Sequence, residues 1–154
     1  MRWGGGIGWL RVRRCRCRSC GASHALLPAF LVARRMDLAS AIGLALVMAA
    51  AGRGHRPVAA AAGVPETTAR GWLRRLRARA AWLRMWFARL AWELGGQTAR
   101  APPSGEVLAW LLEAITAAHT AARERLGAGV AACVWSFSSA ASGGRWLSNT
   151  DAPW

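Results

Sequence analysis

Arginine is concentrated in two stretches of this 154-residue chain, and its guanidinium group binds phosphates and pairs with guanine. All 21 basic residues are arginine, and with 7 acidic residues the formal net charge is +14. Residues 1–35 contain eight arginines and no acid, and residues 53–89 contain nine arginines with Glu66 as their one acid. Residues 90–154 are close to neutral. GC-rich codon usage explains a high arginine content but not this distribution, which predicts attraction of polyanions.

Thiols form the second group of reactive side chains. Cys17 and Cys20 are separated by two residues in the segment RCRCRSCG. Two thiolates at this spacing supply one half of a zinc ribbon, whose other half is a second cysteine pair. No cysteine precedes Cys15, so the further ligands nearby are Cys15 and His24. We interpret Cys17 and Cys20 as a half-site, with structural Zn²⁺ as the one cofactor that this pattern suggests.

Enzymatic chemistry is hard to derive from the remaining residues. The two Asp and five Glu are dispersed, whereas a two-metal nuclease or transposase needs carboxylates at set spacings. The chain has no glycine-rich phosphate loop after a strand and no nucleophile elbow. We therefore expect a protein that is not an enzyme and takes no small-molecule substrate.

The arginines of the middle stretch require an element that positions them, and residues 58–76 match the spacing of a helix-turn-helix. In this pattern Ala59 is small where two helices cross, Gly63 takes the turn, and Val64, Ala69 and Trp72 anchor the second helix in the core. Arg70 and Arg74, one turn apart, would pair with bases, and Arg75, Arg77 and Arg79 would meet phosphates. The full set predicted to contact DNA is Glu66, Thr67, Arg70, Gly71, Arg74, Arg75 and Arg77.

The second helix of this pair is predicted to continue far beyond its DNA face. Apolar residues recur in alternating steps of four and three from residue 69 to residue 94, and Gly95 and Gly96 follow. We call this set the apolar row: Ala69, Leu73, Leu76, Ala80, Leu83, Phe87, Leu90 and Leu94. Two interpretations are open, a helix that packs in its own core and a homodimer seam suited to two half-sites.

The chain is expected to be mostly α-helical and to have four parts. Residues 1–36 form a small, basic, irregular start with loops or short strands, and residues 37–96 form the helix-turn-helix region with its extended third helix. Residues 97–105 form a linker, and residues 106–154 a helical C-terminal region. The longest apolar run, residues 38–52, is too short to cross a bilayer. With no convincing targeting segment and few cysteines, we expect a cytoplasmic protein without a membrane partner.

These features together resemble a family of short bacterial proteins of unassigned function that combine a zinc-ribbon-like start with a transposase-type helix-turn-helix. The resemblance lies in RCRSCGASHALLPAF (16–30), GHRPVAAAAGVPETTARGWLRRLRARA (54–80) and SGGRWLSNTDAPW (142–154). It implies binding of double-stranded DNA without a catalytic domain, with Cys17 and Cys20 as the second ribbon pair and residues 58–75 as the helix-turn-helix. The chain departs from the family pattern because it lacks the first cysteine pair.

Two other functions compete with a DNA-binding regulator or a mobile-element-derived protein. In one, the apolar row and the tryptophans serve helical self-assembly, and the basic charge is incidental. In the other, the cationic surface binds anionic membranes. Replacing Arg70 and Arg74 with Ala separates DNA binding from self-assembly, because only the DNA-binding hypothesis requires lost binding to DNA. Arginine-dependent lipid binding with no preference among DNA sequences would favour the membrane hypothesis.

Overall fold

The computed structural model describes residues 2–3, 6–33, 35, 37–97, 106–129 and 132–147. Within these ranges the chain is mostly helical, as predicted from its sequence. The helices are α1 (Ala39–Ala50), α2 (His55–Ala62), α3 (Glu66–Glu93), α4 (Val107–Leu126) and α5 (Val134–Ala141). The strands β1 (Arg2–Trp3) and β2 (Gly6–Ile7) pair antiparallel, as do β3 (Arg13–Arg16) and β4 (Ser23–Leu26). Residues 98–105 of the predicted linker and residues 148–154 lie outside the described ranges.

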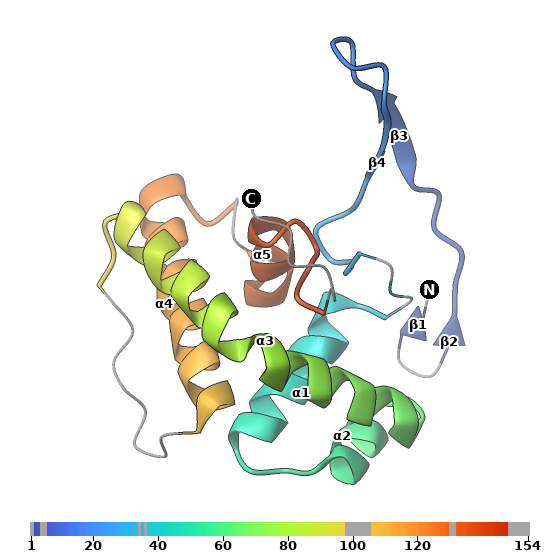
Figure 1. Cartoon of the computed structure of the whole chain (residues 1–154), viewed down its shortest axis with the longest axis vertical. Coiled ribbons are helices and arrows are strands. Elements are labelled where there is room, and N and C mark those ends of the chain that lie inside the picture. Colours follow the sequence, from blue (N-terminus) through green and yellow to red (C-terminus); the bar gives the residue numbers. More distant parts are fainter. Residues whose placement is uncertain are drawn as a thin grey trace.

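Helix α3 crosses the helical part of the molecule from end to end (Figure 1). Its 28 residues bury the apolar row from Ala69 to Phe87 and leave Leu90 half-buried, as is Leu94 directly after the helix. The first half of α3 packs against α1 and α2, and α4 packs along the helix more extensively than any other element. From Ala69 to Phe87 the chain's own helices therefore cover the row that one interpretation assigned to a dimer seam.

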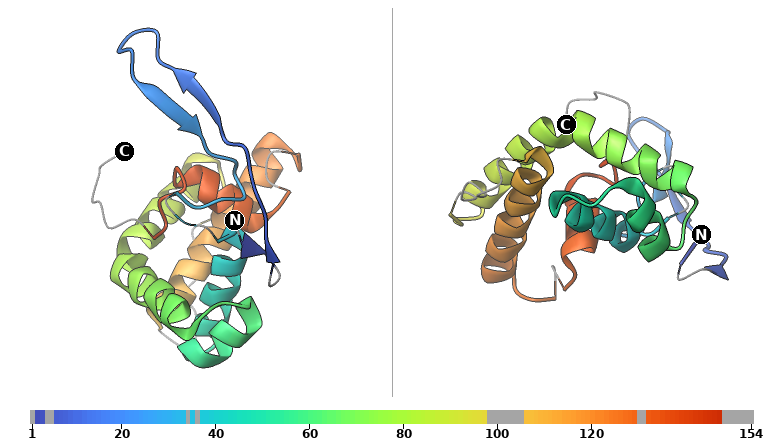
Figure 2. Two further views of the ribbon diagram at one scale, coloured as in Figure 1. Left: turned by 90° about the vertical axis from the view of Figure 1, so that its right-hand side faces the viewer. Right: turned by 90° about the horizontal axis from the view of Figure 1, so that it is seen from below.

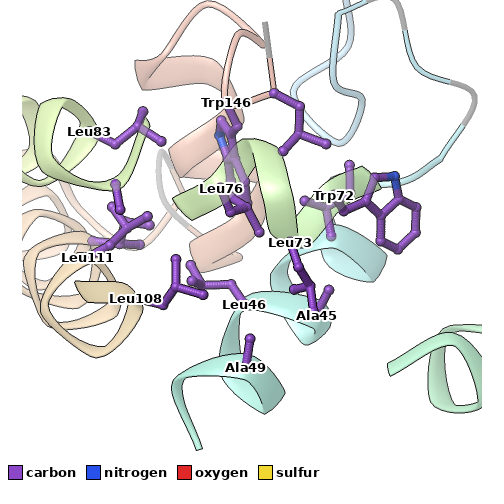
Figure 3. Packing of buried hydrophobic residues seen from close by; sticks show 14 of the residues in the cluster. Ala45, Leu46, Ala49, Trp72, Leu73, Leu76, Leu83, Leu108, Leu111 and Trp146 are labelled. Carbon is purple, nitrogen blue, oxygen red and sulfur yellow. The ribbon is translucent and has the colours of Figure 1, made fainter. Parts of the chain in front are cut away.

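One cluster of buried side chains joins residues 37–96 to residues 106–147. Leu46, Leu73, Leu76, Leu108 and Leu111 come from three helices and point toward one another (Figure 3). The inner face of α4 is buried from Leu108 to Ala122, and the helix ends before Gly127. Burying an isobutyl side chain contributes about 1.5–3 kcal/mol, so this cluster is the main support of α3.

Two close approaches explain why glycine occurs inside the helical region. A Cβ atom on Gly43 of α1 would lie 2.1 Å from the ring of Trp135, so only glycine lets α5 pack there. A Cβ atom on Gly96 would lie 2.5 Å from Cβ of Ala121, where the chain leaves α3 against α4. Both glycines thus set the distance between neighbouring elements.

The β3–β4 hairpin extends from the helical body as an arm (Figures 1 and 2). Every residue of its two strands is exposed. The register pairs Arg13 with Leu26 and Cys15 with His24. A two-stranded hairpin without a buried face is marginally stable by itself, so its backbone hydrogen bonds are its main support.

Across the described ranges, no helix combines the length and the apolarity required to cross a lipid bilayer.

Candidate nucleic-acid interface

A tight turn joins α2 to α3. Gly63 adopts the left-handed conformation with φ 63° and ψ 38°. Its amide donates to the carbonyl of Ala60 at 3.4 Å, and the amide of Val64 donates to the carbonyl of Ala59 at 3.1 Å. This pair of bonds is a Schellman motif, which satisfies carbonyls at the end of a helix and redirects the chain. Glycine suits the turn because other residues adopt positive φ at a cost.

The first half of α3 has one buried and one exposed face. Ala69, Trp72, Leu73 and Leu76 are buried. Glu66, Thr67, Arg70, Arg74 and Arg77 are exposed, and their steps of three and four place them along one face of the helix. We call these five residues the α3 polar face. The buried side chains hold the helix axis in place, so the polar face is presented on a rigid support.

Two residues of α2 that the sequence did not single out as site residues lie beside this face. Arg56 Nε is 3.6 Å from Glu66 Oε2, and His55 Nε2 is 3.8 Å from the same oxygen. Arg70 Nη2 lies 3.3 Å from His55 Nε2. Their position in the sequence could have indicated this. In a helix-turn-helix the first helix packs across the second, and His55 and Arg56 lie at the start of the predicted first helix.

Arg75 does not share the α3 polar face. Its guanidinium is half-buried and donates through Nη1 to the carbonyl of Gly71 at 3.1 Å. Burial lowers the pKa of Arg75, and the positive charges of Arg35 and Arg74 lower it further. Of the predicted contact residues, Arg75 is therefore the one whose charged group is committed to the protein's own backbone.

Gly71 lies in the interior of α3, where it is half-buried. A Cβ atom added there would meet only Nη1 of Arg75, at 3.0 Å. That atom is the end of a flexible side chain, so intramolecular packing does not require glycine at this position.

The two exposed arginines of α3 beyond Arg77 each lie close to another side chain of the protein. The guanidinium of Arg84 lies 4.7 Å from the ring centre of Trp110 in α4, a cation–π distance. Arg89 Nε is 2.7 Å from Glu93 Oε1 one turn later. Charged groups available to a polyanion are therefore concentrated in the first half of the helix.

The predicted metal half-site lies at the tip of the β3–β4 hairpin. The amide of Cys17 donates to Ala22 at 2.8 Å, and the amide of Gly21 donates to Cys17 at 3.0 Å. Cys17 Sγ lies 3.0 Å from the hydroxyl oxygen of Ser19. Hydrogen bonds from the Ser19 hydroxyl and from the backbone and thiol of Cys20 lower the pKa of Cys17 to about 6.

Cys15 and His24 face each other across the two strands, beside the thiols at the tip. Among the described residues, no three His, Cys, Asp or Glu side chains lie close enough to hold a metal ion. The thiols of Cys17 and Cys20 amount to half of a tetrahedral thiolate set, and Zn²⁺ there would need two further ligands to approach. Zinc binding stays a prediction.

Comparisons of the chain with protein-family models, with curated proteins and with solved structures find no match. The resemblance to helix-turn-helix proteins therefore stays a prediction, and support for a function comes from the geometry of α2 and α3.

Proposed function

We propose that this chain is a non-enzymatic protein that binds double-stranded DNA, with α2 and α3 as a helix-turn-helix and α3 as the helix that enters the major groove. It would serve as a regulator or as the recognition part of a mobile element. The observation that carries the proposal is the α3 polar face, which is exposed directly above the buried residues Ala69, Trp72, Leu73 and Leu76.

The dimensions of α3 suit this role. An α-helix with its side chains is about 10–12 Å wide, and the major groove is about 12 Å wide. Arg70 and Arg74 are about 6 Å apart along the helix axis, close to the rise of two base pairs. Each could pair with a guanine through two hydrogen bonds, which discriminates against another base by about 1–3 kcal/mol.

The residues around these arginines support separate roles. Glu66 lies between His55 and Arg56 of α2, so it positions the start of α3 and keeps Arg56 beside the groove face. Arg77 and Arg56 would contact phosphates, which position a protein on the duplex without reading sequence. If four to six arginines neutralise phosphates, log K should fall against log salt with a slope of about −4 to −5.

The test measures both affinity and sequence preference. A random duplex library is first selected for binding, and the selected and scrambled duplexes are then titrated by fluorescence anisotropy. Arg70→Ala/Arg74→Ala should weaken binding to the selected duplex by at least about tenfold and bring its affinity close to that of the scrambled one.

The matched control is Arg123→Ala/Arg125→Ala, which removes the same charge from the exposed end of α4. It should retain the preference for the selected duplex. Circular dichroism melting would verify that both variants fold. The proposal is wrong if the wild-type chain prefers no duplex, or if both double variants lose the preference equally.

One observation favours a different function. Met85 and Trp92, in the second half of α3, are 61% and 70% exposed. They are two helical turns apart on one face of α3, and an exposed apolar patch favours a helical interaction module or a second copy of this chain. This face offers a homodimer a surface outside the buried part of the apolar row. Sedimentation of Met85→Ser/Trp92→Ser beside the wild-type chain tests this, because a dimer through these residues predicts that the variant alone sediments as a monomer.

A further inference from the structure

A cavity of about 490 Å³ lies between the second half of α3 and α5. Trp86 and Leu90 of α3, Leu94 just after that helix and Phe137 of α5 are among the residues that line it. The cavity is half-open, because six of the residues that line it are exposed. Clefts that bind small molecules have volumes of about 300–1,000 Å³, and this volume falls within that range.

The lining is uncharged. None of the described residues that line the cavity is acidic or basic, although the chain carries a net charge of +14. The indole nitrogen of Trp86 donates to the carbonyl of Ala141 at 3.2 Å, so its polar atom is already satisfied. A charged ligand would lose part of its hydration in this space without gaining a counter-charge, and that cost favours an uncharged one.

Two polar groups interrupt the apolar wall. Cys133 precedes the first turn of α5 and Ser136 lies within that turn, and both line the cavity. Burial raises the pKa of Cys133, but hydrogen bonds from the amides of Ser136 and Trp135 and from the Ser136 side chain outweigh it and leave the pKa below the usual value. Cys133 and Leu126 are exposed, so the cavity opens to solvent beside them.

We propose that this cavity binds a small, uncharged, predominantly apolar or aromatic molecule that makes one hydrogen bond at the start of α5. Volume, an uncharged lining and one polar end select such a molecule over an ion, a sugar or a nucleotide. The proposal does not depend on DNA binding, because the α3 polar face lies on the other half of the helix.

The test uses the uncharged fluorescent probe N-phenyl-1-naphthylamine and the full chain. Titration should give saturable binding of one probe per chain. Ala140→Leu adds bulk at an exposed lining residue and should weaken binding by about tenfold, because the space is then partly filled. Ala81→Leu makes the same change at an exposed residue of α3 that does not line the cavity, and it should leave the affinity unchanged.

A second measurement places the probe. Saturating probe should slow alkylation of Cys133 by N-ethylmaleimide, followed by mass spectrometry, and should leave Cys15, Cys17 and Cys20 at their free rates. Saturable binding with selective protection of Cys133 supports the proposal. It is overturned if no saturable binding occurs, if Ala140→Leu binds like the wild type, or if all four cysteines react at unchanged rates in the presence of the probe.

Discussion

Two regions of this molecule are rich in arginine, and their supports differ. Residues 11–26, which include the β3–β4 hairpin, contain five arginines, and every residue of the two strands is exposed. The first half of α3 contains the arginines of the α3 polar face, directly above buried core residues. The two regions lie at opposite ends of the molecule, with the hairpin at one end and α2 at the other (Figures 1 and 2).

The difference shows what charge alone contributes. Guanidinium groups attract a polyanion wherever they are exposed, since that attraction needs little geometry. Reading a base requires a donor held within a few tenths of an ångström, which in turn requires an element whose other face is packed. We therefore expect the hairpin to contribute attraction only and α3 to contribute recognition.

The largest expected effect is on the free energy of unfolding, which should depend far more on the buried face of α3 than on the hairpin. Leu76→Ala, at a fully buried position of α3, should lower the free energy of unfolding by about 2–5 kcal/mol, because it leaves a cavity in the core. Leu26→Ala in the hairpin, where the side chain is 52% exposed, should lower it by less than about 1 kcal/mol. Urea denaturation followed by circular dichroism measures both. Equal losses would show that the hairpin is packed as firmly as α3.

Removing hairpin arginines should weaken binding to DNA without changing its sequence preference. Arg13→Ala/Arg18→Ala removes two exposed hairpin arginines and should weaken binding to selected and scrambled duplexes by the same factor. If both contact phosphate, the slope of log K against log salt should become shallower by about 2. Anisotropy titrations at several salt concentrations measure this. A loss of preference for the selected duplex would place base readout in the hairpin and contradict the expectation that α3 alone contributes recognition.

Replacing Gly63, before α3, and Gly71, inside it, with alanine should change the free energy of unfolding in opposite directions. Gly63→Ala forces a side chain into positive φ and should lower the free energy of unfolding by about 1 kcal/mol. Gly71→Ala replaces glycine inside a helix and should raise it by up to about 1 kcal/mol. If DNA approaches α3 closely at Gly71, the second variant should nevertheless bind the selected duplex more weakly. Thermal melting and anisotropy together distinguish a stability effect from a binding effect.

The smallest effect tests local chemistry at the hairpin tip. Because its pKa is lowered to about 6, Cys17 should react with iodoacetamide at a rate that rises with pH, is half-maximal near pH 6 and is level above neutrality. Ser19→Ala removes the first cause of the shift and should move the midpoint to higher pH. Ser23→Ala, which removes the partner of Arg14, is the control and should leave the midpoint in place. Identical midpoints in all three proteins would exclude the Ser19 hydroxyl as the cause.

Much of the fold follows from local patterns. The apolar spacing of residues 69–87 corresponds to positions that are buried in α3, and Leu108, Leu111 and Ile115 are buried in α4 as their spacing predicts. The helix near the C-terminus does not follow from such patterns, because a short apolar run has no periodicity that separates strand from helix. In the structure Val134–Ala141 forms α5, which packs against α1 and α4.

The candidate site was only partly accessible from the sequence. Arg70 and Arg74 are exposed as predicted, whereas Arg75, one residue later, lies half-buried on another flank of α3. His55 and Arg56 join Glu66 only because α2 packs across the start of α3. Spacing places residues on a helix, but it does not reveal which neighbour covers each flank.

The sequence by itself determined the helical character of the chain, the periodic burial of α3 and the concentration of arginine around it, since these depend on residues a few positions apart. Tertiary structure alone decided that the chain's own helices bury the apolar row from Ala69 to Phe87, that Arg75 is withdrawn from the polar face, and that an uncharged cavity opens between α3 and α5. Those outcomes depend on contacts between segments distant in the chain, and local spacing carries no information about which surfaces meet.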